Sequence, residues 1–320
     1  MRVLFLGTPA FAVPTLHRLV QSKQTVAAVV TQPDRPRGRG QKVESPPAKE
    51  AARAAGLPIL QPKDPSAPEF LRTVRMASPD CALVVAYGRL LSPSFLELFP
   101  KGVYNLHGSL LPKYRGAAPI QWALIRGEKE TGVTVFHLDE QLDHGPALLR
   151  RTLSIAPEED AVSLAHRLAE LGADAVLEAL DRIAAGTASL EPQQEALATL
   201  APRLTKEAGR IDWSCSSEEI HNLVRGVQPW PGAFTTLEGK LLKILAVTTN
   251  PNQPFVLRQA QHERPSPGTV LSADPSAGLW VQTGSGLLRI LRLQPEAGKP
   301  LDAADYLRGH PIPLGTRLTN

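Results

Sequence analysis

The sequence is poor in cysteine and in long apolar runs, and each shortage excludes a class of protein. Its 320 residues include two cysteines, Cys81 and Cys215, and neither lies in a Cys-x-x-Cys or Cys-x-x-His pattern. Structural zinc sites depend on such spacing, so we expect no metal. No apolar stretch approaches the ~20 residues that cross a bilayer, so we expect no membrane partner. With nothing to indicate an oxidising compartment, the cytoplasm is the expected location.

Aromatic side chains and net charge are also scarce. Aromatic residues make up 5% of the chain, so the core must be built from Leu, Val, Ile and Ala. The formal net charge is only +4, from 35 basic and 31 acidic residues, so bulk charge does not indicate a nucleic-acid partner. At 42% hydrophobic and 21% charged the composition is that of a globular protein, and the length favours two domains.

A third absence is the dinucleotide-binding fingerprint Gly-x-Gly-x-x-Gly. The apolar residues 3–6 predict a buried first strand, but the turn after it, Gly7-Thr8-Pro9, holds a single glycine. The fingerprint also needs an acidic residue for the ribose, and Asp34 comes too late and is followed by arginines. A nicotinamide-dependent enzyme is therefore not expected.

Predicted strands and helices alternate along the first part of the chain. The strands are expected at residues 3–6, 26–30, 59–60, 81–86, 102–106 and 131–138, with helices after residue 9 and at 46–55, 120–126 and 159–185. Such alternation predicts an α/β fold with a doubly wound, mostly parallel, Rossmann-like sheet. Ligands of such sheets bind beyond the carboxyl ends of the strands, where Gly7, Tyr87 and His107 are expected.

The pattern changes in the second part of the chain. A polar segment without clear periodicity is followed by a predicted helix at 214–227 and by short alternating stretches with turn signals. Short strands of this kind predict a small C-terminal β-barrel, OB-like in size. Residues 249–266 are rich in Pro, Gln and Asn and predict a loop. The expected organisation is a catalytic domain at 1–188, a linker at 189–206 and the barrel at 207–320.

Asn105 and His107 form the most informative pair of residues in the sequence. They are two positions apart at the end of a predicted strand, so their side chains share a face while Leu106 points the other way. A carboxamide and a protonated imidazole can stabilise the oxyanion that forms when an amine attacks a formyl or acyl carbon. A carboxylate such as Asp143 could orient the imidazole and help to move the proton. An ordinary strand end remains the alternative, because Asn is also a common turn residue.

A basic segment follows the second predicted strand. Between Asp34 and Lys42 its glycines and proline predict a loop, which could grip phosphates or could be a solvated charged surface. Its four cationic residues are Arg35, Arg37, Arg39 and Lys42.

An apolar loop directly follows the Asn-x-His pair. Ser109-Leu110-Leu111-Pro112 places two leucines beside polar side chains. Such a loop could form the wall of a pocket for a flat ring, or it could simply pack against the next helix.

The motifs together resemble those of the folate-dependent formyltransferases, in the branch that acts on methionyl-tRNA, and they cover nearly the whole chain. The matching stretches are Gly7–Phe11, Thr31–Asp34 with the basic segment after it, Val84–Gly88, Tyr104–Pro112, Arg115–Gln121, Glu130–Thr134, Leu142-Asp143, Ile211–Trp213 and Pro229–Ala233.

This resemblance implies an activity and a site. A formyl group would pass from 10-formyltetrahydrofolate to the amino group of methionine on initiator tRNA, for translation initiation. Asn105 and His107 would stabilise the oxyanion, and Asp143 would pair with His107. The folate would contact Ser109, Leu110, Leu111 and Pro112, with the backbone of Ala86, Tyr87, Gly88 and Leu90 beside its ring. The loop with Arg35, Arg37, Arg39 and Lys42 would contact the tRNA, the barrel would hold the tRNA body, and we expect a monomer.

The family pattern around the catalytic carboxylate is Gly-Leu-Asp-Thr-Gly, whereas this chain has Gln141 and His144 at the Gly and Thr positions. These two residues are expected to affect the loop geometry and the pH optimum. Two other functions remain open. One is a related folate enzyme that formylates a nucleotide sugar or another small amine, or hydrolyses 10-formyltetrahydrofolate; the other is a folate- or RNA-binding protein without catalysis. The basic segment favours an acceptor with a polyphosphate backbone.

Overall fold

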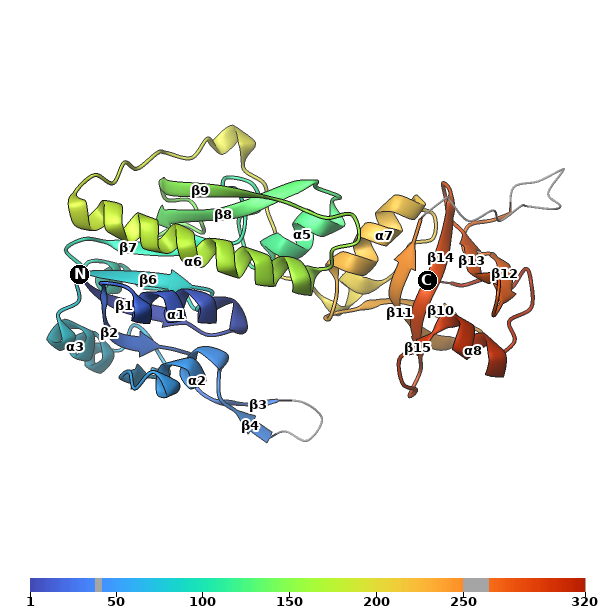
Figure 1. Cartoon of the computed structure of the whole chain (residues 1–320), viewed down its shortest axis with the longest axis horizontal. Helices are drawn as coiled ribbons and strands as arrows, with labels where there is room; N and C mark the ends of the chain where they lie inside the picture. The colour runs from blue at the N-terminus through green and yellow to red at the C-terminus, as the bar shows by residue number, and fades with distance from the viewer. Residues whose placement is uncertain (38–41, 250–264, 320) are drawn as a thin grey trace. The chain divides into compact units, whose positions relative to one another are not determined.

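The computed structural model describes residues 1–37, 42–249 and 265–319, which fall into two compact units (Figure 1). The first unit comprises Met1–Pro119, Glu130–Ile155 and Ser163–Pro202. The second comprises Ile120–Lys129, Ala156–Val162 and the residues from Arg203 onward. In the described part of the chain, no helix combines the length and apolar character that a bilayer crossing requires.

The first unit is built on a seven-stranded sheet. Its strand order is β5-β2-β1-β6-β7-β8-β9; the first five strands are parallel, and β8 runs antiparallel to both β7 and β9. This confirms the predicted α/β fold with a mostly parallel sheet. The strands are β1 (Arg2–Gly7), β2 (Thr25–Val30), β5 (Ile59–Leu60), β6 (Cys81–Val85), β7 (Val103–His107), β8 (Glu130–His137) and β9 (Ala147–Ser154).

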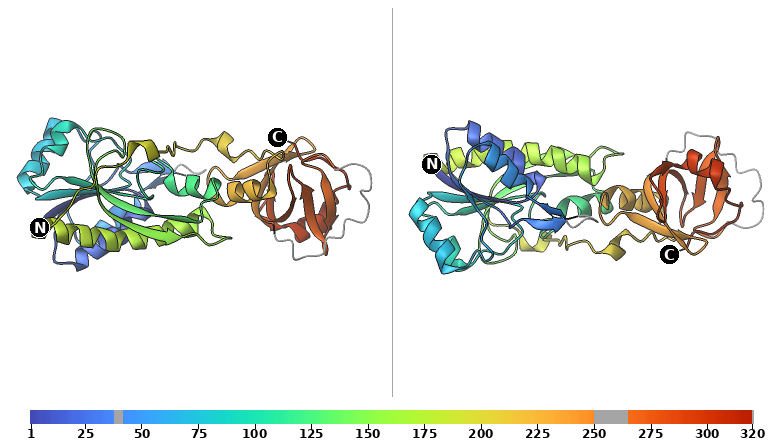
Figure 2. Two further views of the ribbon diagram at one scale, coloured as in Figure 1. Left: turned by 90° about the horizontal axis from the view of Figure 1, so that it is seen from above. Right: turned by 90° about the horizontal axis from the view of Figure 1, so that it is seen from below.

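Helices cover both faces of this sheet (Figure 2). One face carries 3-10 helix η1 (Ala10–Ala12), α1 (Val13–Gln21), α2 (Pro47–Ala54) and α6 (Ala161–Ala185). Nη2 of Arg18 in α1 lies 3.4 Å from Oδ1 of Asp174 in α6, so these two helices lie side by side. The other face carries α3 (Pro68–Ala77) and α4 (Pro93–Leu96), where Phe70 stacks on Phe95.

The central strands are apolar on both faces because both faces are covered. All five residues of β6 are buried, and its first residue, Cys81, is fully inaccessible. Such continuous apolar runs are typical of parallel sheets between two helical layers. The sheet is therefore a rigid platform for the loops at its carboxyl edge.

The basic segment after Asp34 is not simply a loop, and the prediction was wrong on this point. Residues Arg35–Arg37 form β3 and Lys42–Glu44 form β4, which pair antiparallel. The base of this hairpin is anchored, because the Asp34 carboxylate accepts hydrogen bonds from Lys49 Nζ at 2.7 Å and from Gln61 Nε2 at 2.8 Å. Lys49 and Gln61 are 15 and 27 positions from Asp34, so the local Gly and Pro content could not indicate these hydrogen bonds.

The second unit is built on an antiparallel sheet, which confirms the predicted C-terminal sheet domain. The strand order is β10-β11-β14-β13-β12, with β15 on β14. Residues 316–319 pair with both edges of this sheet. Thr319 pairs with Thr236 of β10, and Arg317 pairs with Thr269 beside β12. The strands are β10 (Ala233–Leu237), β11 (Lys240–Thr248), β12 (Val270–Asp274), β13 (Gly278–Gln282), β14 (Leu287–Pro295) and β15 (Leu301–Asp302).

Helices of the second unit complete the list of elements. α7 starts with a capping box, in which Ser216 and Glu219 each accept a hydrogen bond from the other's backbone. The predicted loop at 249–266 lies mostly outside the described residues. The remaining elements are α5 (Pro119–Ile125), α7 (Ser217–Gly226), α8 (Ala303–Gly309) and the 3-10 helices η2 (Glu195–Leu197) and η3 (Lys206–Gly209), of which η2 belongs to the first unit.

Candidate active site

Strand β7 presents Asn105 and His107 on one face of the sheet. The intervening Leu106 is buried and faces α6, where an added Cβ at Gly172 would lie 2.6 Å from its Cδ2 atom. Asn105 is only partly buried, and its carboxamide makes no hydrogen bond with the described residues. An amide donor is thus available beside His107.

His107 is held through both ring nitrogens. Its Nε2 lies 2.8 Å from the carbonyl oxygen of Tyr114, and a carbonyl oxygen can only accept, so Nε2 carries a hydrogen. Its Nδ1 faces Asp143 Oδ2 at 3.6 Å, and the two side chains are 7% and 12% exposed. A doubly protonated ring can donate on both sides. Because Nε2 is occupied, Nδ1 is the nitrogen available for proton exchange.

Asp143 is fixed by its own backbone and by a neighbouring loop. Its φ of 48° is left-handed, which is uncommon for a residue other than glycine and costs about 1 kcal/mol. Its Oδ2 accepts a hydrogen bond of 2.8 Å from the backbone N–H of Gly116. Spacing alone did not link Asp143 to His107, since 36 positions separate them, but the structure brings them together.

Two of the four residues of the apolar loop after β7, residues 109–112, are buried. Thr134 of β8 fixes it, with Oγ1 donating to the Ser109 carbonyl at 2.7 Å and accepting from Leu111 N–H at 3.1 Å. Ser109 and Leu111 are buried. Leu110 and Pro112 keep partial exposure, so these two side chains are the ones that a ligand could touch.

The loop after β6 offers backbone rather than side chains. Ala86 and Gly88 are exposed and have positive φ values of 50° and 77°. Tyr87 between them is 1% exposed and its ring lies in the core, so Ala86 and Gly88 are the parts of this turn that a ligand can reach. The Tyr87 carbonyl accepts from Thr8 Oγ1 at 3.0 Å, which ties this loop to the end of β1. Leu90 is 84% exposed.

Three of the four basic residues expected to contact tRNA belong to the strands of the β3–β4 hairpin. Arg35 is exposed at the start of β3. The backbones of Arg37 and Lys42 pair with each other across the hairpin. Arg39 lies outside the described residues.

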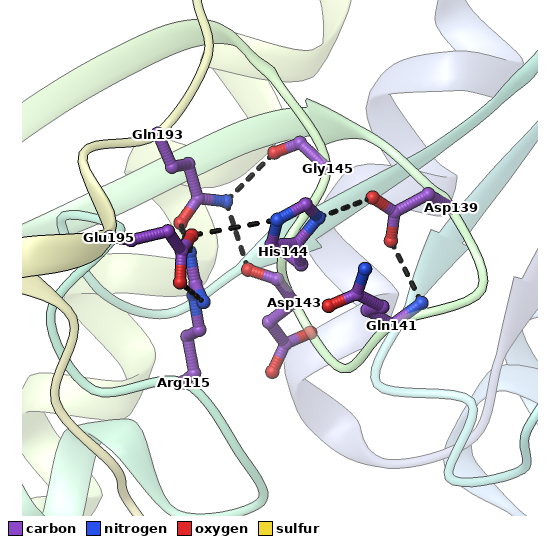
Figure 3. Close-up of polar contacts among 8 residues, drawn as sticks. All are labelled: Arg115, Asp139, Gln141, Asp143, His144, Gly145, Gln193 and Glu195. Atoms are coloured by element: carbon purple, nitrogen blue, oxygen red, sulfur yellow. Dashed lines mark hydrogen bonds and ion pairs between the residues drawn. The ribbon is translucent and has the colours of Figure 1, made fainter.

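Arg115, Gln193 and Glu195, to which the sequence gave no role, lie beside the loop that carries Asp143 (Figure 3). The buried guanidinium of Arg115 forms paired hydrogen bonds with Glu195, at 2.6 and 3.0 Å. This hydrogen bonding lowers the pKa of the Glu195 carboxyl below its ordinary value. Arg115 also donates to Gln193 Oε1 at 2.8 and 3.1 Å. These partners are about 80 positions apart, which explains why no local motif signalled them.

The two departures from the family pattern have distinct surroundings. Gln141 is exposed and is not among the residues with positive φ, so its backbone does not require glycine. Its N–H donates to Asp139 Oδ1 at 2.9 Å. His144 does not contact His107; its Nδ1 lies 2.6 Å from Asp139 Oδ2, and its Nε2 lies 3.5 Å from Glu195 Oε1. Both residues therefore act on the outer side of the loop.

The described residues contain no group of three or more His, Cys, Asp or Glu side chains that could hold a metal ion. What the site assembles is an amide donor, an imidazole whose Nδ1 faces a carboxylate, and that carboxylate. These groups suit a reaction in which an amine adds to a carbonyl carbon and a proton must move.

Family comparisons cover both units of the chain. A family described as "Formyl transferase" matches residues 1–180, and one described as "Formyl transferase, C-terminal domain" matches residues 203–311. The chain is 48% identical over 318 residues to a methionyl-tRNA formyltransferase of Geobacter metallireducens, covering 99% of this chain and 98% of the relative. It is 46% identical to that of Geotalea daltonii with the same coverage.

Solved structures show the same fold at much lower identity. The N-formyltransferase of Helicobacter canadensis, crystallised with folinic acid and dTDP-3-aminofucose, superimposes with a TM-score of 0.64. It shares 17% identity over 92% of this chain and 99% of its own. At this identity the likeness concerns the fold alone.

Proposed function

Since the chain belongs to the formyl transferase family, we propose that it transfers the formyl group of 10-formyltetrahydrofolate to the α-amino group of methionine on initiator tRNA. One observation carries this choice of acceptor: relatives named methionyl-tRNA formyltransferase match 99% of the chain. The supporting site is the arrangement of Asn105, His107 and Asp143. Translation initiation would place the protein in the cytoplasm.

In the proposed reaction the methionine nitrogen attacks the formyl carbon, and the carbonyl oxygen becomes an oxyanion. The Asn105 amide and the protonated His107 ring stabilise that charge. The bond from the formyl carbon to N10 of the folate then breaks. The amine loses a proton and N10 gains one, and Asp143 keeps His107 oriented for this exchange through Nδ1.

The substrates occupy surfaces that the loops provide. Leu110, Pro112 and the backbone of Ala86–Gly88 contact the folate, with Leu90 beside it. The cations Arg35, Arg37, Arg39 and Lys42 contact tRNA phosphates, and the second unit holds the tRNA body. We place the functional boundary between the domains within residues 189–206, and the protein acts as a monomer.

A formylation assay tests the reaction and its acceptor. The wild-type chain is given 10-formyltetrahydrofolate with methionyl initiator tRNA, methionyl elongator tRNA, or an amino-sugar nucleotide. Formyl-methionine should form on the initiator tRNA. Turnover of only the sugar nucleotide, or release of formate without an acceptor, would refute the proposal.

Site variants test the chemistry. Asn105→Ala or His107→Ala should each lower turnover at least ~100-fold, the scale of losing an oxyanion donor or an acid–base group. Near-normal rates in either variant would contradict the assigned roles.

The hairpin is tested by salt dependence. Arg35→Ala should weaken tRNA use and reduce the slope of log affinity against log salt by about 0.7–0.9, the contribution of one phosphate contact. Arg72→Ala is the matched control, because Arg72 is exposed on α3 and makes no described contact. Equal slopes for both variants would remove Arg35 from the tRNA surface.

A further inference from the structure

Residues 191–201, between α6 and the second unit, form a strap across two loops of the site. At one end, Glu191 and Ala147 exchange backbone hydrogen bonds of 2.8 Å. At the other end, Arg115 N–H donates to the Thr199 carbonyl at 2.8 Å, and Ala201 N–H donates to the Arg115 carbonyl at 2.7 Å. The strap therefore joins the loop that contains Tyr114 to the loop that contains Asp143.

The Gln193 side chain is the strap's main contact with the loop of Asp143 (Figure 3). Its Nε2 donates to the carbonyl oxygens of Asp143 at 2.9 Å and Gly145 at 2.8 Å. Its Oε1 accepts two hydrogen bonds from Arg115. Both donor positions of this amide are thus used by one short stretch of backbone, and its acceptor is fixed by a buried cation.

A second strap residue, Thr199, holds the other partner of His107. Its Oγ1 accepts a hydrogen bond of 2.9 Å from Tyr114 N–H, and the Tyr114 carbonyl in turn accepts from His107 Nε2. The strap consequently fixes both groups that flank the imidazole, the carbonyl on Nε2 and the carboxylate on Nδ1. Neither strap residue is near the imidazole in sequence.

We propose that Gln193 is a positioning residue for the proposed formyl transfer. By holding the carbonyls of residues 143 and 145, its amide keeps the left-handed turn at Asp143 in place and so keeps the carboxylate facing His107. This inference rests on the proposed function. Reacting groups displaced by about 1 Å can lose two orders of magnitude in rate, so a lost anchor should appear in turnover rather than in substrate binding.

Glu195 is a weaker anchor than Gln193. Its side chain is 60% exposed, so water can replace its contacts with Arg115 and His144. Gln193 instead bonds directly to the backbone on both sides of His144, and it is the side chain whose removal leaves carbonyl groups unpaired.

The test compares Gln193→Ala with Gln194→Ala, the neighbouring glutamine, whose exposed side chain makes no described contact. Gln193→Ala should lower kcat about tenfold or more and leave KM for both substrates within about threefold. Gln194→Ala should match the wild type. A second variant, Gln193→Glu, still accepts from Arg115 but cannot donate to the carbonyls, so it should also be slow. Wild-type turnover in Gln193→Ala or Gln193→Glu would overturn the proposal.

A double-mutant cycle shows whether Gln193 acts through Asp143. When Asp143 is already alanine, adding Gln193→Ala should cost no further turnover, because the group being positioned is gone. Multiplicative losses would instead show a general structural role and reject the inference.

An activity-free readout separates this inference from the function. The ring nitrogens of His107, observed by NMR after histidine labelling, should shift in Gln193→Ala and stay unchanged in Gln194→Ala. Unchanged signals in both variants would overturn the positioning role, even if the wild-type chain formylates tRNA. If the His107 signals shift in Gln193→Ala but the wild-type chain does not formylate tRNA, the positioning role is supported and only the proposed function is rejected.

Discussion

Replacing Asp143 by asparagine isolates the effect of its charge. The amide oxygen of asparagine can still accept the hydrogen bond from Gly116 N–H, and asparagine tolerates the left-handed backbone that Asp143 adopts. What disappears is a negative charge 3.6 Å from His107 Nδ1. Any change in rate can therefore be assigned to electrostatics rather than to collapse of the loop.

The expected magnitude follows from the distance. At 3.6 Å and an effective dielectric constant of about 20, the attraction between the two unit charges is about 5 kcal/mol. Part of that attraction is already present before the reaction, and only the increase in the transition state affects turnover. Taking somewhat less than half, about 2 kcal/mol, gives a loss of about 30-fold in kcat.

The assay is the steady-state rate of formyl-methionine production at saturating folate and tRNA. Asp139→Asn is the matched control, because the same substitution four positions away removes a charge that faces His144 rather than His107. Asp139→Asn should keep a rate close to that of the wild type. If Asp143→Asn also stays within about threefold of the wild type, the electrostatic reasoning is refuted, since less than 1 kcal/mol would then come from this pair.

Three further predictions concern reactivity and stability. Burial raises the pKa of the Cys81 thiol to about 12, so a thiol reagent at about pH 8 should label Cys215 alone in the native protein and both cysteines after unfolding; two fast thiols in the native state would contradict this. The hydrogen bond from Lys49 holds the pKa of Asp34 below its ordinary 3.8, so this carboxylate stabilises the fold above that pH and the stability is lost as the pH falls below it. Measured by urea unfolding, the unfolding free energy of Asp34→Asn should fall less at acid pH than that of the wild type. An identical pH dependence would show that the hydrogen bonds of Asp34 do not stabilise the fold. Phe95→Ala, at a fully buried ring, should lower the unfolding free energy by about 3–5 kcal/mol, and a loss below about 1 kcal/mol in the same measurement would show that the site repacks.

The sequence predicted the platform of the site well because the signals are local. The apolar residues 3–6 and 81–86 identified β1 and β6, and the alternation at Asn105 and His107 identified their common face. The alternating strands of the second unit were likewise visible as short apolar stretches between turns. Burial on one or both faces leaves a periodic trace that can be read directly from the residues.

The parts that the sequence could not predict depend on contacts between distant residues. The anchor of the hairpin joins Asp34 to Lys49 and Gln61, and the strap joins Arg115 to Gln193, with no periodic trace for either contact. Strand β9 was missed because its second half, which begins with Arg150 and Arg151, is largely polar and at most partly buried. The Asp143 pairing came from family resemblance and not from spacing.

Residues 316–319, which bond to Thr236 of β10 and to Thr269 beside β12, affect how the second unit forms. The Thr235 hydroxyl donates a hydrogen bond to the Thr319 carbonyl across 84 positions, so the edges at β10 and beside β12 lack these partners until residues 316–319 are in place. During synthesis the strand edges are exposed to other chains until those residues leave the ribosome. Pairing between residues so far apart typically takes on the order of milliseconds to seconds, so these edges stay exposed longer than those of strands that pair locally.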